Sequence, residues 1–352
     1  MGIFMIPRDT RPSHLTRRIV TIFAALAVGN VAAWLWALFA FREQPILLGT
    51  AFLAYVLGLR HAVDPDHIAA IDNVTRKLMA QGDRPVSAGL WFALGHSTIV
   101  VVAAGLLALT ASALQDSFAD FKDAGGLVGV SVSAGFLLLI GLFNLVVLAD
   151  VWRAFKLYRA TGRYNEDDTN ALLARRGFLA RILRPLFAMI SKSWHMYPLG
   201  LLFALGFDTA TEISLFGVAA AAGADGLSFW AIMSFPLLFT AGMALADTAD
   251  GVLMLGAYGW AYVKPARKFF YNIAITGMSI FVAFVIGGIE ALGLIGERLK
   301  LEGWFWESIA SANDNLPIFG FVIVGLFAAA ALLSITIYKL GNFDPPAVEF
   351  EA

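Results

Sequence analysis

Long apolar stretches separated by short polar segments dominate the chain. A helix needs about 20 apolar residues to cross the roughly 30 Å hydrocarbon core of a bilayer. Eight stretches meet this requirement, and a composition of 59% hydrophobic and 14% charged residues agrees with them. The pattern predicts an all-α integral membrane protein, with residues 1–352 forming one polytopic domain of eight transmembrane helices near 19–41, 46–72, 86–110, 127–150, 197–222, 228–262, 270–295 and 316–339.

Two of these stretches are irregular. Residues 45–59 supply only about fourteen apolar positions, fewer than a span needs, so the polar stretch RHAVDPDHIAAIDN at 60–73 is expected inside the membrane. The sixth stretch has too many residues for one straight span and carries DTADG within it. We therefore expect a bent or interrupted sixth helix, with Gly242 and Gly251 as its weak points.

Lysine and arginine residues predict the orientation. The N-terminal arm carries Arg8, Arg11, Arg17 and Arg18, and the connection at 153–196 carries nine basic residues, whereas Lys122 is alone in the third connection. Basic connections face the cytoplasm, so both termini are expected there. The 153–196 connection is a basic cytoplasmic loop, either with short amphipathic helices on the membrane surface or simply solvated. No small-residue cleavage pattern follows the first apolar run, which we therefore interpret as a retained helix.

Carboxylates inside the predicted spans are the main chemical signal. Each ionised side chain costs about 2.5–3.5 kcal/mol at the bilayer centre, so six of them cost roughly 15–20 kcal/mol if unpaired. Arg60 is the only obvious basic partner, which indicates a cation from outside the chain. The six carboxylates are Asp64, Asp66, Asp208, Glu212, Asp247 and Asp250.

The spacing of these side chains favours a metal site. His61, Asp64 and His67 are predicted to share one helix face, and Asp208 with Glu212 and Asp247 with Asp250 do the same. His96 adds an imidazole, and the chain has no cysteine. Imidazole and carboxylate without sulfur suit nickel, cobalt, zinc or manganese. Pro65 predicts a kink that frees carbonyls or turns Asp66 and His67 inward.

Structural interpretations compete with this one. A single His96, or Ser97 and Thr209, could simply hydrogen-bond between helices. Asp72, Asn73 and Arg76 could cap a helix or extend to the membrane boundary. Asn144 and Glu290 are isolated, which favours a structural role. The HAVDPDH segment at 61–67 has few structural explanations, because it places two histidines and two acids inside one span.

Four segments resemble the NiCoT family of nickel/cobalt transporters. His61, Asp66 and His67 match the family's pattern in its second helix, and the other matches are LGHS at 94–97, LGFDTATEI at 205–213 and GMALADTADG at 242–251. Family members usually carry a small residue where this chain has Pro65. The resemblance implies a secondary transporter, not an enzyme, that imports Ni²⁺ or Co²⁺ across a bacterial-type cytoplasmic (inner) membrane. His61, Asp66 and His67 would form the core of its ion site.

Asp64 and His96 join these three as candidate metal ligands. The candidate translocation path comprises Ser97, Asp208, Thr209, Glu212, Asp247 and Asp250. The partners are the metal ion and the lipid bilayer, with no cofactor and no nucleic acid. An ATPase subunit is not required, because an inside-negative potential favours divalent entry by about 4.6 kcal/mol per 100 mV. No phosphate-binding Gly-x-x-x-x-Gly-Lys segment is present.

Three alternatives remain. Efflux of the same ions is one, although the histidine-rich loop of the export branch is missing from the sequence. The second is an intramembrane metalloenzyme, but the His-Glu-x-x-His pattern of zinc proteases does not occur. A metal sensor is the third, and no long polar output domain accompanies the spans.

Overall fold

The computed structural model describes residues 12–110, 115–161, 190–206, 210–224, 226–261, 265–316 and six positions between 319 and 329 (319, 322, 323, 325, 326 and 329). Every regular element in these ranges is a helix, in agreement with the predicted all-α class. The elements are α1 (Pro12–Ala40), α2 (Ile46–His61), α3 (Pro65–Ala80), α4 (Ala88–Thr110), α5 (Gln115–Thr161), η1 (Ser193–His195), α8 (Met196–Phe203), η2 (Ala204–Gly206), α9 (Ala210–Ala224), α10 (Phe229–Ile232), α11 (Ser234–Ala261), α12 (Pro265–Arg298) and α13 (Trp304–Asp314).

Five helical segments are long and apolar enough to cross a membrane, and α2 with α3 adds a sixth if the bent pair is one span. They coincide with six of the eight predicted spans. In the region of the predicted fifth span, α8, η2 and α9 replace a single helix, and residues 207–209 lie outside the described ranges. Most of the predicted eighth span also lies outside them. The five segments are His14–Ala40, Ala88–Ala108, Gly129–Arg153, Phe229–Gly256 and Thr276–Arg298.

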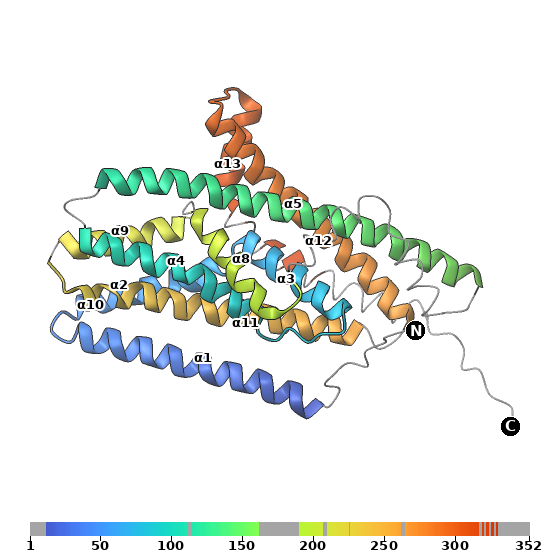
Figure 1. Ribbon diagram of the computed structural model, residues 1–352, viewed down its shortest axis with the longest axis horizontal. Helices are drawn as coiled ribbons and strands as arrows, with labels where there is room; N and C mark the ends of the chain where they lie inside the picture. Colours follow the sequence, from blue (N-terminus) through green and yellow to red (C-terminus); the bar gives the residue numbers. More distant parts are fainter. Residues whose placement is uncertain are drawn as a thin grey trace.

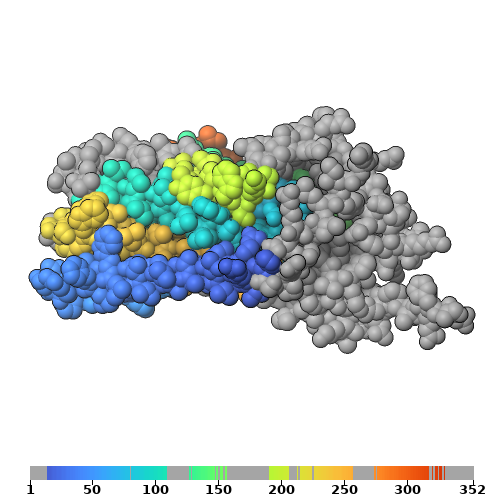
Figure 2. Space-filling model, turned by 60° about the horizontal axis from the view of Figure 1, so that its bottom comes forward, coloured from blue at the N-terminus to red at the C-terminus, as the bar shows by residue number. Residues whose placement is uncertain are grey.

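Helix α1 lies along one side of the bundle and α5 along the opposite side (Figure 1). The outward side of α1 is apolar, since Val28 is 69% and Phe39 is 72% exposed. Figure 2 shows this surface, with α1 in blue beside the yellow segment that contains α11. Exposing such an apolar surface to water would cost free energy, whereas contact with lipid tails would not.

The second predicted span is broken. Helix α2 ends at His61, α3 starts at Pro65, and the two are bent by 51°. Proline has no N–H and disfavours helical backbone in the preceding residue, and Asp64 is accordingly extended, with φ −63° and ψ 142°. The kink predicted at Pro65 is therefore present. The single helix face predicted for His61, Asp64 and His67 is wrong, because these residues belong to two helices and their link.

The break predicted at Gly242 or Gly251 in the sixth span is wrong, and the span is interrupted instead at Met233, between α10 and α11. Helix α11 is unbroken from Ser234 to Ala261 and passes through the whole DTADG segment. Its glycines instead let neighbouring helices approach: a Cβ at Gly242 would lie 2.6 Å from the carbonyl oxygen of Tyr55, and one at Gly251 would lie 3.4 Å from Ile71. Because these two glycines have no side chain, neighbouring helices pack closely against α11, and the helix does not bend there.

Helices α4 and α8 meet backbone to backbone. A Cβ at Gly95 would overlap the carbonyl oxygen of Tyr197, and one at Gly200 would overlap that of Phe92. Gly58 on α2 and Gly89 on α4 make the same kind of contact with the backbone of α11. Small residues permit such close helix pairs in membranes. Helices α2, α4, α8 and α11 therefore form one tightly packed group.

Helix α5 continues through residues 153–161, the start of the predicted basic loop. Residues 162–189 of that loop lie outside the described ranges. Helix α5 packs instead along α12, where a Cβ at Gly141 would lie 3.3 Å from the Cβ of Ala283. Ile323, beyond α13, is buried in the same apolar cluster as Leu137 of α5 and Ile286 of α12.

Candidate metal-ion site

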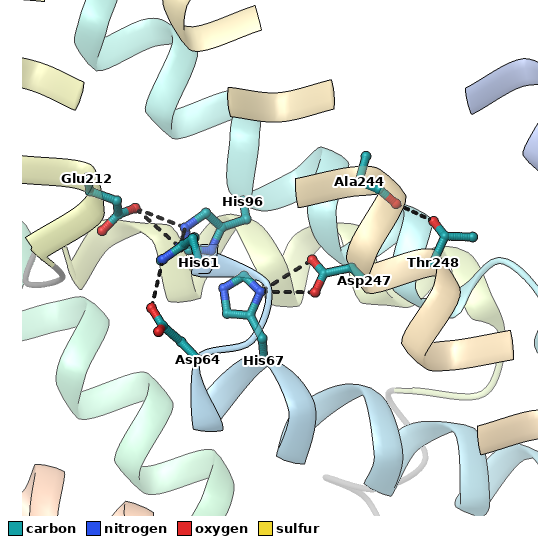
Figure 3. A network of polar contacts seen from close by, with 8 residues as sticks. All are labelled: His61, Asp64, His67, His96, Glu212, Ala244, Asp247 and Thr248. Carbon is teal, nitrogen blue, oxygen red and sulfur yellow. Dashed lines mark hydrogen bonds and ion pairs between the residues drawn. The ribbon is translucent and has the colours of Figure 1, made fainter. Parts of the chain in front are cut away.

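Three histidines from three helices meet inside the bundle. His61 ends α2, His67 lies in the first turn of α3, and His96 lies on α4 (Figure 3). Their ring centroids are 4.6 to 4.8 Å apart. One ring nitrogen from each lies within 4.8 Å of the others, and all three side chains are buried. The arrangement is compact enough for one ion to contact all three rings.

The break at Pro65 brings His61 and His67 together. In a straight helix the two residues would be separated by nearly two turns, about 9 Å along the axis. The bend folds the start of α3 back toward the end of α2, so the two rings meet edge to face at 4.6 Å. Asp64 occupies the position before α3 without capping it. Its carboxylate instead accepts a hydrogen bond from His61.

Two carboxylates orient two of the imidazoles. Nδ1 of His61 lies 2.9 Å from Oδ2 of Asp64, and Nδ1 of His67 lies 3.3 Å from both carboxylate oxygens of Asp247 (Figure 3). An ionised carboxylate only accepts, so each Nδ1 would be the donor, and in the neutral imidazole each Nε2 would keep its lone pair. Carboxylates orient metal-binding histidines in this way in many proteins. Asp247 is fully buried, and α11 supplies it.

Glu212 on α9 completes the cluster. Its Oε1 lies 2.9 Å from Nε2 of His96 and 3.9 Å from Nε2 of His61, while the two Nε2 atoms are 2.9 Å apart. Two ligands about 2.05 Å from a metal and at right angles to it would be separated by about 2.9 Å. Nε2 of His96 therefore has the spacing of a neighbouring ligand to both other atoms, while Nε2 of His61 and Oε1 of Glu212, 3.9 Å apart, have nearly the spacing of ligands on opposite sides of one ion.

Phenylalanine rings enclose the histidines. Phe92 meets His67 edge to face with centroids 4.8 Å apart, and Phe239 lies 5.4 Å from His61. Both phenylalanines are fully buried, which excludes bulk water from these sides of the cluster. Charged groups interact more strongly in such surroundings than in water. With its carboxylates ionised and its imidazoles neutral, which is the state that binds a metal, the cluster would have a formal charge of −3, and this charge would favour a divalent cation.

The other sequence candidates that the structure describes lie outside this group. Asp66 is half-buried and makes no hydrogen bond to the cluster within the described ranges. Ser97 is buried beside His96, and neither its Oγ nor Oδ2 of Asp250 has a hydrogen-bond partner in the part of the chain that the structure describes. Asp208 and Thr209 lie outside the described residues.

A second polar group was missed at the sequence level. Asp72, Asn73 and Arg76 are buried between helices, which argues against the interpretation that their side chains extend out of the bundle. Asn144, predicted to be isolated, donates to Oδ1 of Asn73, and Glu290 accepts a 2.9 Å hydrogen bond from Ser133. The positions of 72, 73 and 76 on one side of a helix were the available signal.

Comparison with known proteins identifies the family. Residues 47–337 match the family model NicO, described as high-affinity nickel-transport protein. The chain belongs to this family of nickel transporters. The high-affinity nickel transport protein of Cupriavidus necator is 53% identical over 331 residues, which cover 94% of each chain. No solved structure matches.

Two further relatives illustrate the range of the family. The hydrogenase nickel incorporation protein HupN of Bradyrhizobium diazoefficiens is 53% identical over 343 residues, covering 96% of this chain and 90% of its own. The cobalt transport protein NhlF of Rhodococcus rhodochrous is 40% identical over 284 residues, or 80% of each chain. The NicO relatives are transporters, which confirms the predicted transport class and the prediction that the chain is not an enzyme. In this family the metal is a substrate, and no cofactor is implied.

Proposed function

We propose that this NicO member imports Ni²⁺, and also Co²⁺, through the histidine cluster. The cluster itself carries the proposal: Nε2 of His61, His67 and His96, with Oε1 of Glu212, would bind the ion. Asp64 and Asp247 would orient His61 and His67 without touching the metal. Three nitrogens and one oxygen suit borderline divalent ions better than Mg²⁺ or Ca²⁺, which prefer oxygen ligands.

The membrane arrangement is part of the same proposal. We infer eight spans with both termini in the cytoplasm, the polytopic domain lying in a bacterial-type inner membrane. The bent α2–α3 pair would be the second span, α8 to α9 the fifth, and the chain after α13 the eighth. The basic residues at the N-terminus and at 153–196 support this orientation.

The membrane potential would drive import without an ATPase subunit. A divalent ion moving into a cell at −100 mV gains about 4.6 kcal/mol, which supports accumulation by over three decades. The absence of a histidine-rich loop from the sequence favours import over efflux. The path to or from the cluster would then be lined by Asp66, Ser97, Asp208, Thr209 and Asp250. Proton coupling is a separate property to measure.

Accumulation of radioactive nickel tests the proposal. Cells that lack their own nickel importers would express the chain, its His67→Ala variant, or the control His14→Ala, whose histidine is exposed on α1 and far from the cluster in sequence. We expect uptake by the chain and the control at matched membrane levels, and none by His67→Ala. Net loss of nickel from the expressing cells would instead identify an exporter. Competition with cobalt then measures selectivity.

A further inference from the structure

A second set of buried polar side chains lies on α3, on the side away from the histidines. At 100° per residue, positions 72, 73 and 76 lie about 140–240° around the helix from His67. They face α5 and α12. We refer to the following six residues as the α3 polar face: Asp72, Asn73 and Arg76 on α3, Asn144 on α5, and Thr276 and Ser279 on α12.

Hydrogen bonds join the two sides of this face. Asn144 donates to Oδ1 of Asn73, which also accepts a 3.0 Å hydrogen bond from Nη2 of Arg76. Nη1 of Arg76 donates to Thr276, and Ser279 donates to Oδ2 of Asp72 at 2.7 Å. All six side chains are buried. The contact between α3 and the α5–α12 pair thus includes a row of side-chain hydrogen bonds within the helix bundle.

The neighbouring interfaces are of another kind. Helices α2, α4, α8 and α11 touch backbone to backbone through glycines, as at Gly95 and Gly200. Helices α5 and α12 also approach closely, and a Cβ at Gly287 would lie 3.0 Å from the Cβ of Leu137. Sliding the helices at either contact would drive backbone atoms into side chains, and separating them would leave voids. The α3 polar face is different, because water can replace each of its hydrogen bonds when the two sides separate.

The buried histidines require such a separation. His61 is 1%, His67 is 0% and His96 is 3% exposed, so an ion among them has no contact with the cytoplasm in this conformation. Release needs a part of the bundle to move. Besides these hydrogen bonds, α3 shares an apolar cluster with α5 and α12 that includes Ile68, Leu137 and Val282. Side-chain contacts of both kinds separate at lower cost than interlocked backbones.

We propose that the α3 polar face is the inner gate of the transporter: α5 and α12 move together away from α3 to open the release path toward the cytoplasmic connections. The inference rests on the proposed import function. Asp72 and Arg76 are one turn apart on α3, so their charges offset each other along the opened path. The face would neither trap nor repel a departing divalent ion as a single unpaired charge would.

Thiol cross-linking in proteoliposomes tests the gate, because the chain contains no cysteine of its own. The test variant Asn73→Cys/Asn144→Cys places one thiol on each side of the face, to be linked by a short, cleavable bifunctional reagent. The control Gly141→Cys/Ala283→Cys links α5 to α12 within the proposed moving unit. Nickel binding and nickel uptake would be measured before linking, after linking and after cleavage.

We expect linking of 73 to 144 to reduce uptake by about tenfold or more, with full recovery on cleavage, while nickel binding is kept and the linked control transports as before. Undiminished uptake by the linked test variant would overturn the gate and leave the import function intact. Absence of nickel uptake by the unmodified chain would contradict the import function itself.

Labelling provides a second measurement if the test variant is inactive before linking. Ser279→Cys would be exposed to a membrane-impermeant maleimide from the cytoplasmic side of inside-out vesicles, with Ala283→Cys as the control. Opening of the α3 polar face predicts labelling at 279 that accelerates when nickel is present, and none at 283. A thiol at 279 that stays unlabelled with and without nickel would show that this face remains closed.

Discussion

Nδ1 of His67 on α3 lies 3.3 Å from both carboxylate oxygens of Asp247 on α11, a residue 180 positions later in the chain. This contact determines which nitrogen of His67 is available. Nε2 of His67 has no hydrogen-bond partner among the residues that the structure describes. A buried polar atom without a partner is costly unless a ligand satisfies it.

Asp247→Asn should therefore weaken nickel binding by about 10- to 100-fold while the protein folds normally. The amide keeps the shape of the side chain but loses the charge that orients His67. Equilibrium binding of nickel to the purified protein measures the effect, and size-exclusion profiles check folding. Unchanged affinity would mean that Asp247 has no role in positioning the imidazole.

Glu212→Gln should reduce nickel affinity by about tenfold or more, because it removes a negative charge and an oxygen ligand from the cluster. Glu290→Gln is a matched control, since Glu290 is also buried but bonds to Ser133 away from the histidines. Concentration-dependent uptake of both variants separates affinity from maximal rate. Equal losses in the two variants would contradict the assignment of Glu212 to the ion site.

Excess Co²⁺ should suppress nickel uptake, whereas Mg²⁺ at a thousandfold higher concentration, about the millimolar range in which hard cations occur, should not. Magnesium holds its water shell and selects oxygen ligands, while the cluster offers three imidazoles. Competition in the uptake assay gives the answer directly. Inhibition by magnesium at similar concentrations would indicate a site formed by carboxylates instead.

Collapse of the membrane potential should lower nickel accumulation by about three decades per 100 mV at equilibrium. Proteoliposomes with a potassium gradient and valinomycin provide a potential of chosen size. The logarithm of the internal to external nickel ratio should rise linearly with that potential. A slope corresponding to zero net charge would indicate exchange for two protons.

Gly95→Ala should destabilise the folded protein by about 1–3 kcal/mol, because the new methyl group overlaps the carbonyl oxygen of Tyr197. Gly217→Ala on α9 is the control, since nothing lies within 4 Å of its Cβ position. Thermal unfolding of the detergent-solubilised variants compares the two. Equal stability would show that α4 and α8 can separate slightly at no cost.

The sequence alone predicted the residues of the candidate site better than the way in which the helices assemble it. His61, His67 and His96 were identified because histidines with acids inside a span have few structural uses. Glu212 and Asp247 were assigned only to the path, since their distances to His96 and His67 depend on how α9 and α11 pack. Gly242 was misjudged because sequence cannot separate a glycine that bends a helix from one that admits a neighbour.

The hydrogen bond between Asn144 and Asn73 could not be predicted from the sequence either. The two residues are 71 positions apart, and neither lies in a recognisable pattern with the other. Pro65, by contrast, acts locally through its own ring and the residue before it, so its effect on the second span was predictable. The effect of a local covalent constraint could therefore be predicted from the sequence. Contacts between helices that are far apart in the sequence could not.

The order in which the ribosome produces these helices has a consequence for the cell. His61, His67 and His96 emerge early, but Glu212 and Asp247 follow more than a hundred residues later. Chains are made from the N-terminus at roughly 5–20 residues per second, so α2, α3 and α4 spend several seconds in the membrane without these carboxylates. A nascent or truncated chain thus lacks Glu212, the proposed oxygen ligand, and Asp247, which would orient His67, so we expect the proposed ion site to form only after synthesis has passed α11.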